Sequence, residues 1–325
     1  MGRLSVTSIF RKYMMEIILL LLFILLAVFA PGFIRGSNLL GILRNMAIVG
    51  VIAFGMTMVI ISGEIDLSVG SSIAFYCVLL ATFTGSFEEA GIPRESGVLI
   101  AIVITLAISV AVGVLNGLIR TKFGVPSFII TLAMLNVLYG LSAIISNGFP
   151  VTTFPTWYNN IGAGQLFGVI PLPALWLAIV FIVVFVVMNY TRFGREVYAV
   201  GGNQESARLS GINVNKVKVM TLTSVQFLAA LASIIMSSQV MAGSSTFGKG
   251  YEMDVISSVI IGGASLNGGI GKVWGTFIGI IFLGILINGM TLLRFDDYVK
   301  YVVRGALILV AVLINTIQVR NMQKA

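Results

Sequence analysis

The stretch GVLIAIVITLAISVAVGVLNGLI, residues 97–119, contains 23 residues and no charged side chain. An α-helix needs about 20 mainly apolar residues to cross the hydrocarbon core of a bilayer, so this stretch predicts a membrane-spanning helix. Apolar segments separated by polar, glycine and proline clusters recur along the chain and give the same indication. The ten expected spans are residues 13–30, 43–62, 67–84, 97–119, 126–146, 171–189, 217–240, 253–264, 273–290 and 298–317.

The composition extends this prediction to the whole chain. Of 325 residues, 58% are hydrophobic and 10% are charged, and the mean hydropathy is +1.05. Soluble domains carry about a quarter charged residues, and no polar stretch here is long enough to form a separate domain. We therefore expect an all-α polytopic membrane protein with a single transmembrane domain over residues 1–325, whose membrane-spanning region covers residues 13–317.

The distribution of basic residues predicts the orientation. Ten spans place both termini on one side of the membrane, and Lys and Arg are enriched in cytoplasmic connections. Alternate connections hold 13 Lys and Arg on the side of the termini and 6 on the other, and Arg304 lies inside the last span, which accounts for all 20. Both termini are therefore expected in the cytoplasm. The terminal segments contribute Arg3, Arg11, Lys12, Arg320 and Lys324 to this count.

Several classes of chemistry are disfavoured by the residues present. The chain has no histidine, which removes His-based catalytic triads and His-ligated zinc. Cys77 is the only cysteine, so no intrachain disulfide can form. The net charge of +8 has the sign that cytoplasmic flanks of membrane spans produce, without a nucleic-acid partner. We expect no catalytic residues, no metal site and no cofactor bound by this chain.

Two polar, glycine-containing segments interrupt the apolar pattern, SGEIDLSVGS at residues 62–71 and GGASLNGGIG at residues 262–271. Non-helical backbone at membrane depth is tolerated only where protein or a watery cavity satisfies its polar groups. One or two broken or re-entrant segments are therefore expected, and the eighth span, 253–264, is short enough to be one. The lead-ins VIISG at 59–63 and VIIGG at 259–263 indicate either an internal repeat or a chance match.

Polar side chains in or beside the spans are the candidates for a translocation pathway. Asp66 either lines the pathway or accepts hydrogen bonds from the amides that follow it, as a cap of the third helix, and capping is favoured. Glu64 is favoured as a solvated carboxylate at the cytoplasmic boundary. Asn136, Asn288 and Tyr139 either hold helices together or line a polar passage, and interhelical packing is favoured.

The longest connection on the side of the termini covers residues 190–216. Its second half predicts a short helix, in which Asn203 is the cap, Glu205 lies near the positive end of the dipole and Arg208 near the negative end, and Gly211 ends the helix. A short charged helix held at the membrane surface is suited to dock a soluble partner. The alternative is a basic loop without a partner.

Motifs spread over nearly the whole chain resemble, in order, those of the permeases of ribose-type ABC importers. They are GEIDLSVGS at 63–71, TRFG at 191–194, YAVGGN at 198–203, ARLSGINV at 207–214, GYEMD at 250–254 and GTFIG at 275–279. Together these motifs are specific, although each alone is short. Relatives in this family carry monosaccharides, autoinducer-2 and polyols. Glu64 departs from the family pattern, since many relatives have glycine or another uncharged residue there.

The resemblance implies a permease of the bacterial inner membrane that pairs with a second permease copy, identical or related. A periplasmic solute-binding protein would deliver the sugar, and separate ABC ATPase subunits would bind ATP and Mg²⁺. Residues 190–216 match the family's coupling loop. The residues carried over as candidates for ATPase coupling are Gly202, Asn203, Glu205, Arg208 and Gly211.

Two other classes of protein compete with this interpretation. The chain has no Gly-x-x-x-x-Gly-Lys-Ser/Thr loop to hold ATP phosphates, so energy must come from another polypeptide or from an ion gradient. An ion-gradient-driven secondary transporter would use Glu64 or Asp66. An intramembrane aspartyl protease would need two carboxylates together at membrane depth, whereas Asp254, Asp296 and Asp297 are expected at periplasmic span ends.

Overall fold

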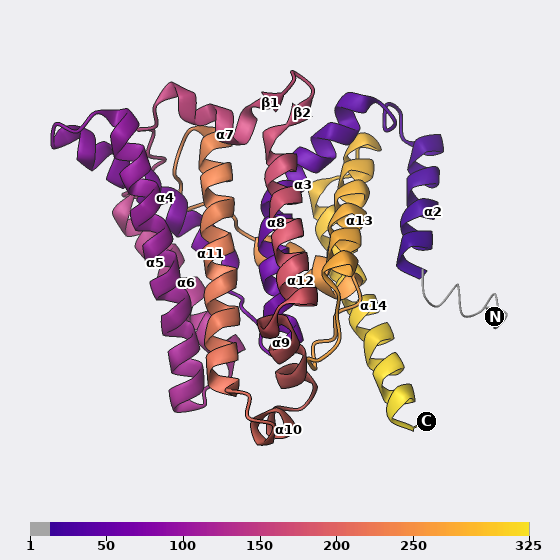
Figure 1. Ribbon diagram of the computed structural model, residues 1–325. Coiled ribbons are helices and arrows are strands. Elements are labelled where there is room, and N and C mark those ends of the chain that lie inside the picture. Colours follow the sequence, from indigo (N-terminus) through magenta and orange to yellow (C-terminus); the bar gives the residue numbers. More distant parts are fainter. Residues whose placement is uncertain (1–13, 325) are drawn as a thin grey trace.

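The computed structural model describes residues 14–324, which form a helical bundle (Figure 1). The elements are α2 (Met14–Phe29), α3 (Gly36–Ile61), α4 (Val69–Glu89), α5 (Arg94–Phe123), α6 (Ser127–Ile145), η1 (Thr156–Tyr158), α7 (Asn159–Ala163), β1 (Gln165–Leu166), β2 (Ile170–Pro171), α8 (Leu172–Tyr190), α9 (Arg192–Gly202), α10 (Gln204–Leu209), α11 (Val214–Val240), α12 (Tyr251–Ile261), α13 (Val273–Leu292) and α14 (Asp297–Lys324). The strands β1 and β2 form a small antiparallel hairpin. Arg3, Arg11 and Lys12 lie outside the described residues, as do the side chains of Arg320 and Lys324.

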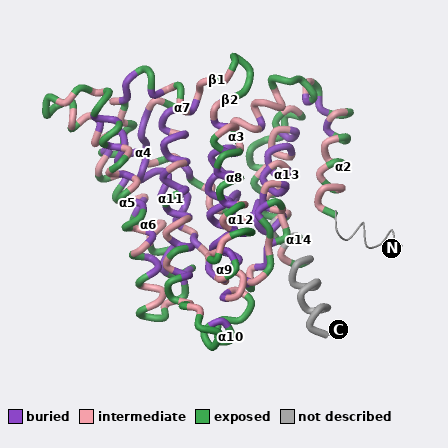
Figure 2. Tube along the Cα trace, in the orientation of Figure 1, coloured by how far each residue is buried: buried purple, intermediate pink, exposed green. Residues whose placement is uncertain are grey.

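The architecture confirms the prediction of an all-α, multi-span membrane fold. Each of the ten expected spans falls on a helix. Helices α3, α4, α5, α6, α8, α11 and α13 are long and apolar enough to cross a membrane, and α2 is apolar but has 16 residues. The helices α3 and α4 are largely buried, whereas α5, α6 and α8 expose large apolar side chains such as Val103, Ile129 and Ile182 (Figure 2). That exposure suits contact with lipid.

Several helices continue beyond the apolar segments that predicted them. Helix α3 begins at Gly36 where the expected start was Leu43, and α5 covers 30 residues. A helix is held by its backbone hydrogen bonds, so it continues through polar residues such as Ser37 and Asn38 into the headgroup region. The apolar pattern therefore locates the part of each helix inside the hydrocarbon and misses its ends.

Helix α12 is the predicted broken segment. It has 11 residues, so at 1.5 Å per residue it is about 16 Å long, which is too short for a hydrocarbon core about 30 Å thick. Its start lies beside the start of α4, because a β-carbon added to Gly70 would contact the Glu252 carboxylate. The first residues of α4 are fully buried. Helix α4 therefore begins inside the protein, beside the half-buried start of α12.

The two similar lead-ins end their helices with the same geometry. Gly63 has φ +81° and Gly263 has φ +89°, a conformation that favours glycine. The Gly63 amide donates to the Ile60 carbonyl at 3.0 Å, and the Gly263 amide donates to the Ile260 carbonyl at 2.9 Å. The next amide in each case bonds back to residue 59 or 259, at 3.1 Å in both. The sequence similarity thus corresponds to one shared helix ending, which favours the internal-repeat interpretation.

Helix α9 was not predicted, because two glycines at its end and a polar start concealed it. The Thr191 hydroxyl accepts a hydrogen bond from the Gly194 amide at 3.3 Å, while Val197 and Val200 are buried. These contacts stabilise an amphipathic helix whose apolar side faces the bundle. Its last turn places Gly201 against the end of α3 and the glycine-rich run 262–271.

The close packing of α5 on α11 depends on two glycines of α5. A β-carbon on Gly113 would lie 2.5 Å from Cα of Thr223, and one on Gly117 would lie 2.7 Å from Cα of Val219. Small residues four apart let two helix backbones approach closely in a membrane.

We expect Gly117→Leu to separate α5 from α11. Overpacking of a tight interface typically costs about 1–3 kcal/mol, so the thermal midpoint of the detergent-solubilised protein should fall. The control is Gly140→Leu on α6, where a β-carbon meets no atom within 4 Å. Equal midpoints for the two variants would show that the α5–α11 contact does not depend on this glycine.

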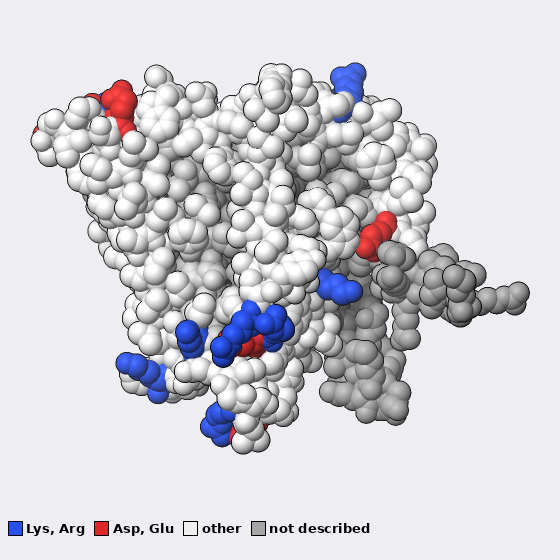
Figure 3. Space-filling model, viewed as in Figure 1, with Lys and Arg blue, Asp and Glu red and all other residues white. Residues whose placement is uncertain are grey.

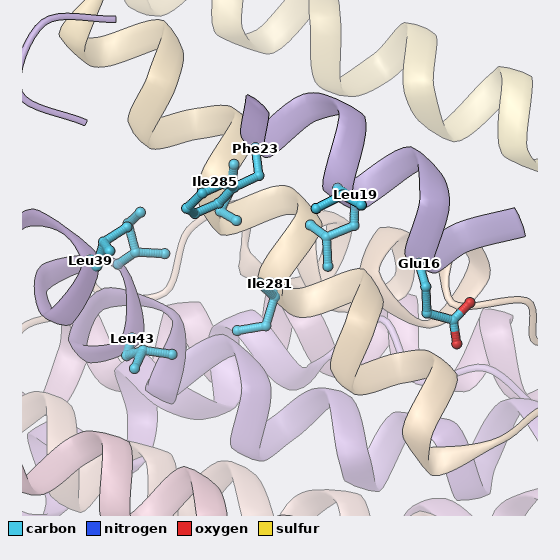
Figure 4. A pocket seen from close by; sticks show the side chains of 9 residues that line it. Glu16, Leu19, Phe23, Leu39, Leu43, Ile281 and Ile285 are labelled. Atoms are coloured by element: carbon cyan, nitrogen blue, oxygen red, sulfur yellow. The ribbon is translucent and has the colours of Figure 1, made fainter. Parts of the chain in front are cut away.

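An apolar cavity of about 520 Å³ lies between α2, α3 and α13 (Figure 4). Its lining includes Leu19, Phe23, Leu39 and Ile285, and Glu16 is the one charged residue in it. A site that orients a small polar solute needs several converging polar groups. This cavity therefore does not supply a sugar site.

Candidate functional site

Helix α10 stands apart from the bundle at the end where α9 lies (Figure 1). The Asn203 side-chain oxygen Oδ1 accepts a hydrogen bond from the Ser206 amide at 2.9 Å, and Arg208 pairs with Glu205 at 2.8 Å. Gly211 follows with φ +82°. The prediction of a short helix capped by Asn203 and ended near Gly211 is confirmed, and Gly202 is the last residue of α9.

The surface of α10 combines charge with one large apolar side chain. Leu209 is 81% exposed, and the Glu205 and Arg208 side chains are also mostly exposed. An open depression of about 470 Å³ beside α10 is lined in part by Arg208 and Asn213. Charged side chains gather at this end of the molecule, while the middle of the same face is nearly free of them (Figure 3). An exposed leucine ringed by charges suits docking of a soluble protein.

Glu64 is buried in an ion cluster, so the expectation of a solvated carboxylate was wrong. Its side chain is 2% exposed and lies 2.6 Å from the Lys218 ammonium, which is itself 4% exposed. Arg120 donates from Nε to both carboxylate oxygens at 2.9 Å. Glu64 is buried because of the tertiary structure: the ends of α5 and α11 bring two cations to the loop between α3 and α4. A buried carboxylate needs such partners.

This cluster makes the stability depend on pH. Burial opposes ionisation of Glu64, but the hydrogen bonds from Arg120 and Lys218 outweigh it and hold the pKa of Glu64 below its usual value of 4.5. The cluster therefore stabilises the fold fully above the unfolded-state pKa, and this contribution is lost as the pH falls through the lower folded-state pKa.

We expect the thermal midpoint of the wild type to fall as the pH drops below the unfolded-state pKa of Glu64, and Glu64→Gln to flatten that part of the profile. At neutral pH the same variant should be less stable by about 3 kcal/mol, since two cations lose their buried partner. The matched control is Glu88→Gln, which removes the exposed pair with Arg94. Parallel profiles for wild type and Glu64→Gln would contradict this assignment.

Asp66 is fully buried and hydrogen-bonded on both oxygens. Oδ1 accepts from the Ser68 amide at 2.8 Å and from the Ser68 hydroxyl, and Oδ2 accepts from Gln226 Nε2 at 2.9 Å. The bond to the Ser68 amide is of the capping type expected, although Ser68 itself occupies the cap position of α4. Gln226 also accepts from Ser72 and Tyr76. The aspartate thus ties α4 to the middle of α11.

The two candidate asparagines, Asn136 and Asn288, differ in their hydrogen-bond partners. Asn288 on α13 exchanges two hydrogen bonds of 2.9 Å with Asn38 on α3, which is an interhelical amide pair. Asn136 is exposed on α6 and donates to the Leu132 carbonyl of its own helix at 3.0 Å, so its contacts do not support interhelical packing within this chain. Tyr139 has a buried hydroxyl without a hydrogen-bond partner among the described residues.

Asp254, an acidic residue expected at a span end, lies on α12. Asp254 lies 3.2 Å from Arg304 on α14 and so faces a cation. Within residues 14–324, no three acidic or cysteine side chains are grouped so that they could hold a metal ion.

Four residues important for this site were missed from the sequence: Arg120, Lys218, Gln226 and Leu209. Arg120 and Lys218 entered only the count of basic residues that predicts the membrane orientation, because a basic residue near a membrane boundary is normally solvated. Gln226 offered a signal, because an amide within an apolar span needs a partner. Leu209 could also have been noticed as an apolar residue in a charged loop.

Comparison with known proteins identifies the family. Residues 38–312 match the family described as branched-chain amino acid transport system, permease component. The chain belongs to this permease family. The permease is 39% identical over 299 residues to the ribose import permease protein RbsC of Bacillus subtilis, covering 91% of this chain and 90% of that protein.

Other relatives are similar over comparable lengths. The permease is 39% identical to the ribose import permease protein RbsC of Escherichia coli K12, covering 94% of this chain and 95% of the relative. It is 35% identical to the L-arabinose transport system permease protein AraH of the same strain, covering 99% and 94%. No solved structure matches the chain. The resemblance to ribose-type permeases drawn from the motifs is thus confirmed.

Proposed function

We propose that this permease is the membrane subunit of an ATP-driven importer that moves a sugar into the cytoplasm. The observation that carries the proposal is α10, a capped helix with an exposed leucine and charges that projects from an apolar bundle. The relatives named as ribose and L-arabinose permeases support a sugar as the solute.

The proposed topology places α9 and α10 in the cytoplasm. About ten helical segments would cross or enter the bacterial inner membrane, with both termini cytoplasmic, in agreement with the excess of Lys and Arg on that side. The opposite end would receive the sugar from a periplasmic solute-binding protein. Its exposed ion pair between Arg94 and Glu88 is of the kind that improves encounter and register between partners.

Energy would come from ABC ATPase subunits that bind ATP and Mg²⁺, docked on α10. Closure of the ATPases would shift α10 and α9, and the packed helices behind them would alternate between outward and inward openings. A second permease copy, identical or related, would complete the translocation path. Asp66 and Gln226, deep between α4 and α11, are candidates for polar groups that such a rearrangement opens.

A secondary transporter is less well supported. A proton-carrying carboxylate must gain and lose its proton during the cycle. Glu64 is neutralised by two cations, which leaves Asp66, hydrogen-bonded to Ser68 and Gln226, as the carboxylate that such a transporter would use. The pairing with cations favours a permanently ionised Glu64 and a structural role.

The proposal is tested by purifying the tagged permease from its own membrane under gentle detergent and assaying the eluate for ATPase activity. An ATPase should accompany the wild type and be lost with Arg208→Glu. The matched control is Arg94→Glu, which reverses an exposed paired arginine outside the α10 region. A wild type that carries no ATPase, or an Arg208→Glu variant that retains it fully, would contradict docking at Arg208.

A further inference from the structure

Lys218 connects the docking helix to the interior loop between α3 and α4. Its ammonium lies 2.6 Å from Glu64 Oε1 and donates to Gln204 Oε1 at 3.0 Å. Gln204 is the first residue of α10. Within the described residues, this is the one side-chain hydrogen bond that joins α10 to a residue beyond the segment 203–213. A displacement of α10 therefore acts directly on the buried ion cluster.

The loop beyond Glu64 is held as an extended segment inside the bundle. The Ile65 amide donates to the Ser127 hydroxyl at 3.1 Å, and the Leu67 amide donates to the Thr131 hydroxyl at 3.0 Å. These bonds satisfy non-helical backbone that packs against α6. The segment then reaches Asp66 and its bond to Gln226. A continuous set of polar contacts thus runs from α10 through Lys218 and Glu64 to the start of α4.

The two cations of the cluster, Arg120 and Lys218, differ in the groups to which they bond. Arg120, at the end of α5, lies 2.9 Å from the Glu64 carboxylate and Lys218 lies 2.6 Å from it, so both stabilise the buried carboxylate. Of the two, Lys218 also donates a hydrogen bond to α10, at Gln204. Arg120 therefore provides an internal reference, because it should support the stability of the cluster without carrying the motion of α10.

We propose that Lys218 is a positioning residue that couples movement of α10 to the Glu64 loop and thereby to the opening of the interior at α4. This inference rests on the proposed role of α10 in ATPase docking. Loss of the link should reduce sugar uptake per ATP hydrolysed by about tenfold.

The test uses the permease assembled with its ATPase and binding protein in proteoliposomes, with sugar uptake and ATP hydrolysis measured together. Gln204→Leu removes the acceptor on an exposed residue and should lower uptake per ATP. Gln204→Glu keeps an acceptor for Lys218 and should restore the ratio to near the wild-type value. Arg120→Met should lower the thermal midpoint while the uptake per ATP of the folded fraction stays close to wild type.

The outcomes separate this inference from the proposed function. If Gln204→Leu assembles with the ATPase and keeps the wild-type ratio, Lys218 carries no coupling and only the inference fails. The inference also fails if Gln204→Glu and Gln204→Leu are equally impaired, because the acceptor would then not matter. A wild-type permease that assembles with no ATPase refutes the proposed function, and the coupling role falls with it.

Discussion

The Gly201→Ala substitution is expected to prevent or severely weaken folding of the permease. A β-carbon at this position would overlap the Ile61 carbonyl oxygen and lie 2.5 Å from the Gly269 amide nitrogen. Both atoms belong to backbone, and the Gly269 amide already donates to the Ile61 carbonyl at 2.8 Å. Neither can move without opening the contact between α3, α9 and the glycine-rich run. A cost of about 3 kcal/mol or more follows, which corresponds to a fall of roughly 5–10 °C in the thermal midpoint.

The neighbouring Gly202→Ala substitution is the matched control. A β-carbon there meets no atom within 4 Å, so the thermal midpoint and the yield of monodisperse protein should remain close to those of the wild type. Fluorescence-detected size-exclusion chromatography after heating measures both quantities. Similar midpoints for Gly201→Ala and Gly202→Ala would show that α9 does not pack as closely as the structure indicates.

The Leu209→Asp substitution should remove most of the affinity for the ATPase. The side chain is 81% exposed on α10, so the fold does not depend on its burial. Burial of an exposed leucine side chain typically contributes about 2 kcal/mol, so its loss from the docked surface is equivalent to roughly 30-fold weaker binding. Titration of the purified permease with its ATPase measures the change directly.

The control for this substitution is Phe167→Asp on the turn between β1 and β2. Phe167 is 88% exposed, and β1 and β2 lie at the opposite end of the bundle from α10 (Figure 1). Its replacement changes the surface by a similar amount but should leave ATPase binding unchanged. Equal affinity of wild type and Leu209→Asp would mean that the ATPase does not use this side chain.

Much of the fold could be predicted because the membrane imposes simple rules. Backbone groups in lipid must be satisfied within a helix, so runs such as residues 97–119 lead directly to α5. The short helix α10 was also predictable, since Asn203, Arg208 and Gly211 act through local capping, dipole and turn preferences. These features depend on residues that are neighbours in the sequence.

The environment of Glu64 could not be predicted for the opposite reason. Its partners Arg120 and Lys218 lie 56 and 154 residues away, and they meet it only because α5 and α11 pack together. A carboxylate between two glycine-containing segments looks solvated until those helices are placed. Helix α9 was missed because its stability comes from burial of Val197 and Val200 against the bundle, while its glycines disfavour a helix locally.

The most direct test of the central claim is sugar uptake by proteoliposomes that contain the permease, its ATPase and its binding protein. Uptake should require ATP on the α10 side, should depend on the binding protein and should continue when the proton gradient is dissipated. Uptake by the permease alone that needs no ATP and stops when the proton gradient collapses would contradict an ATP-driven importer.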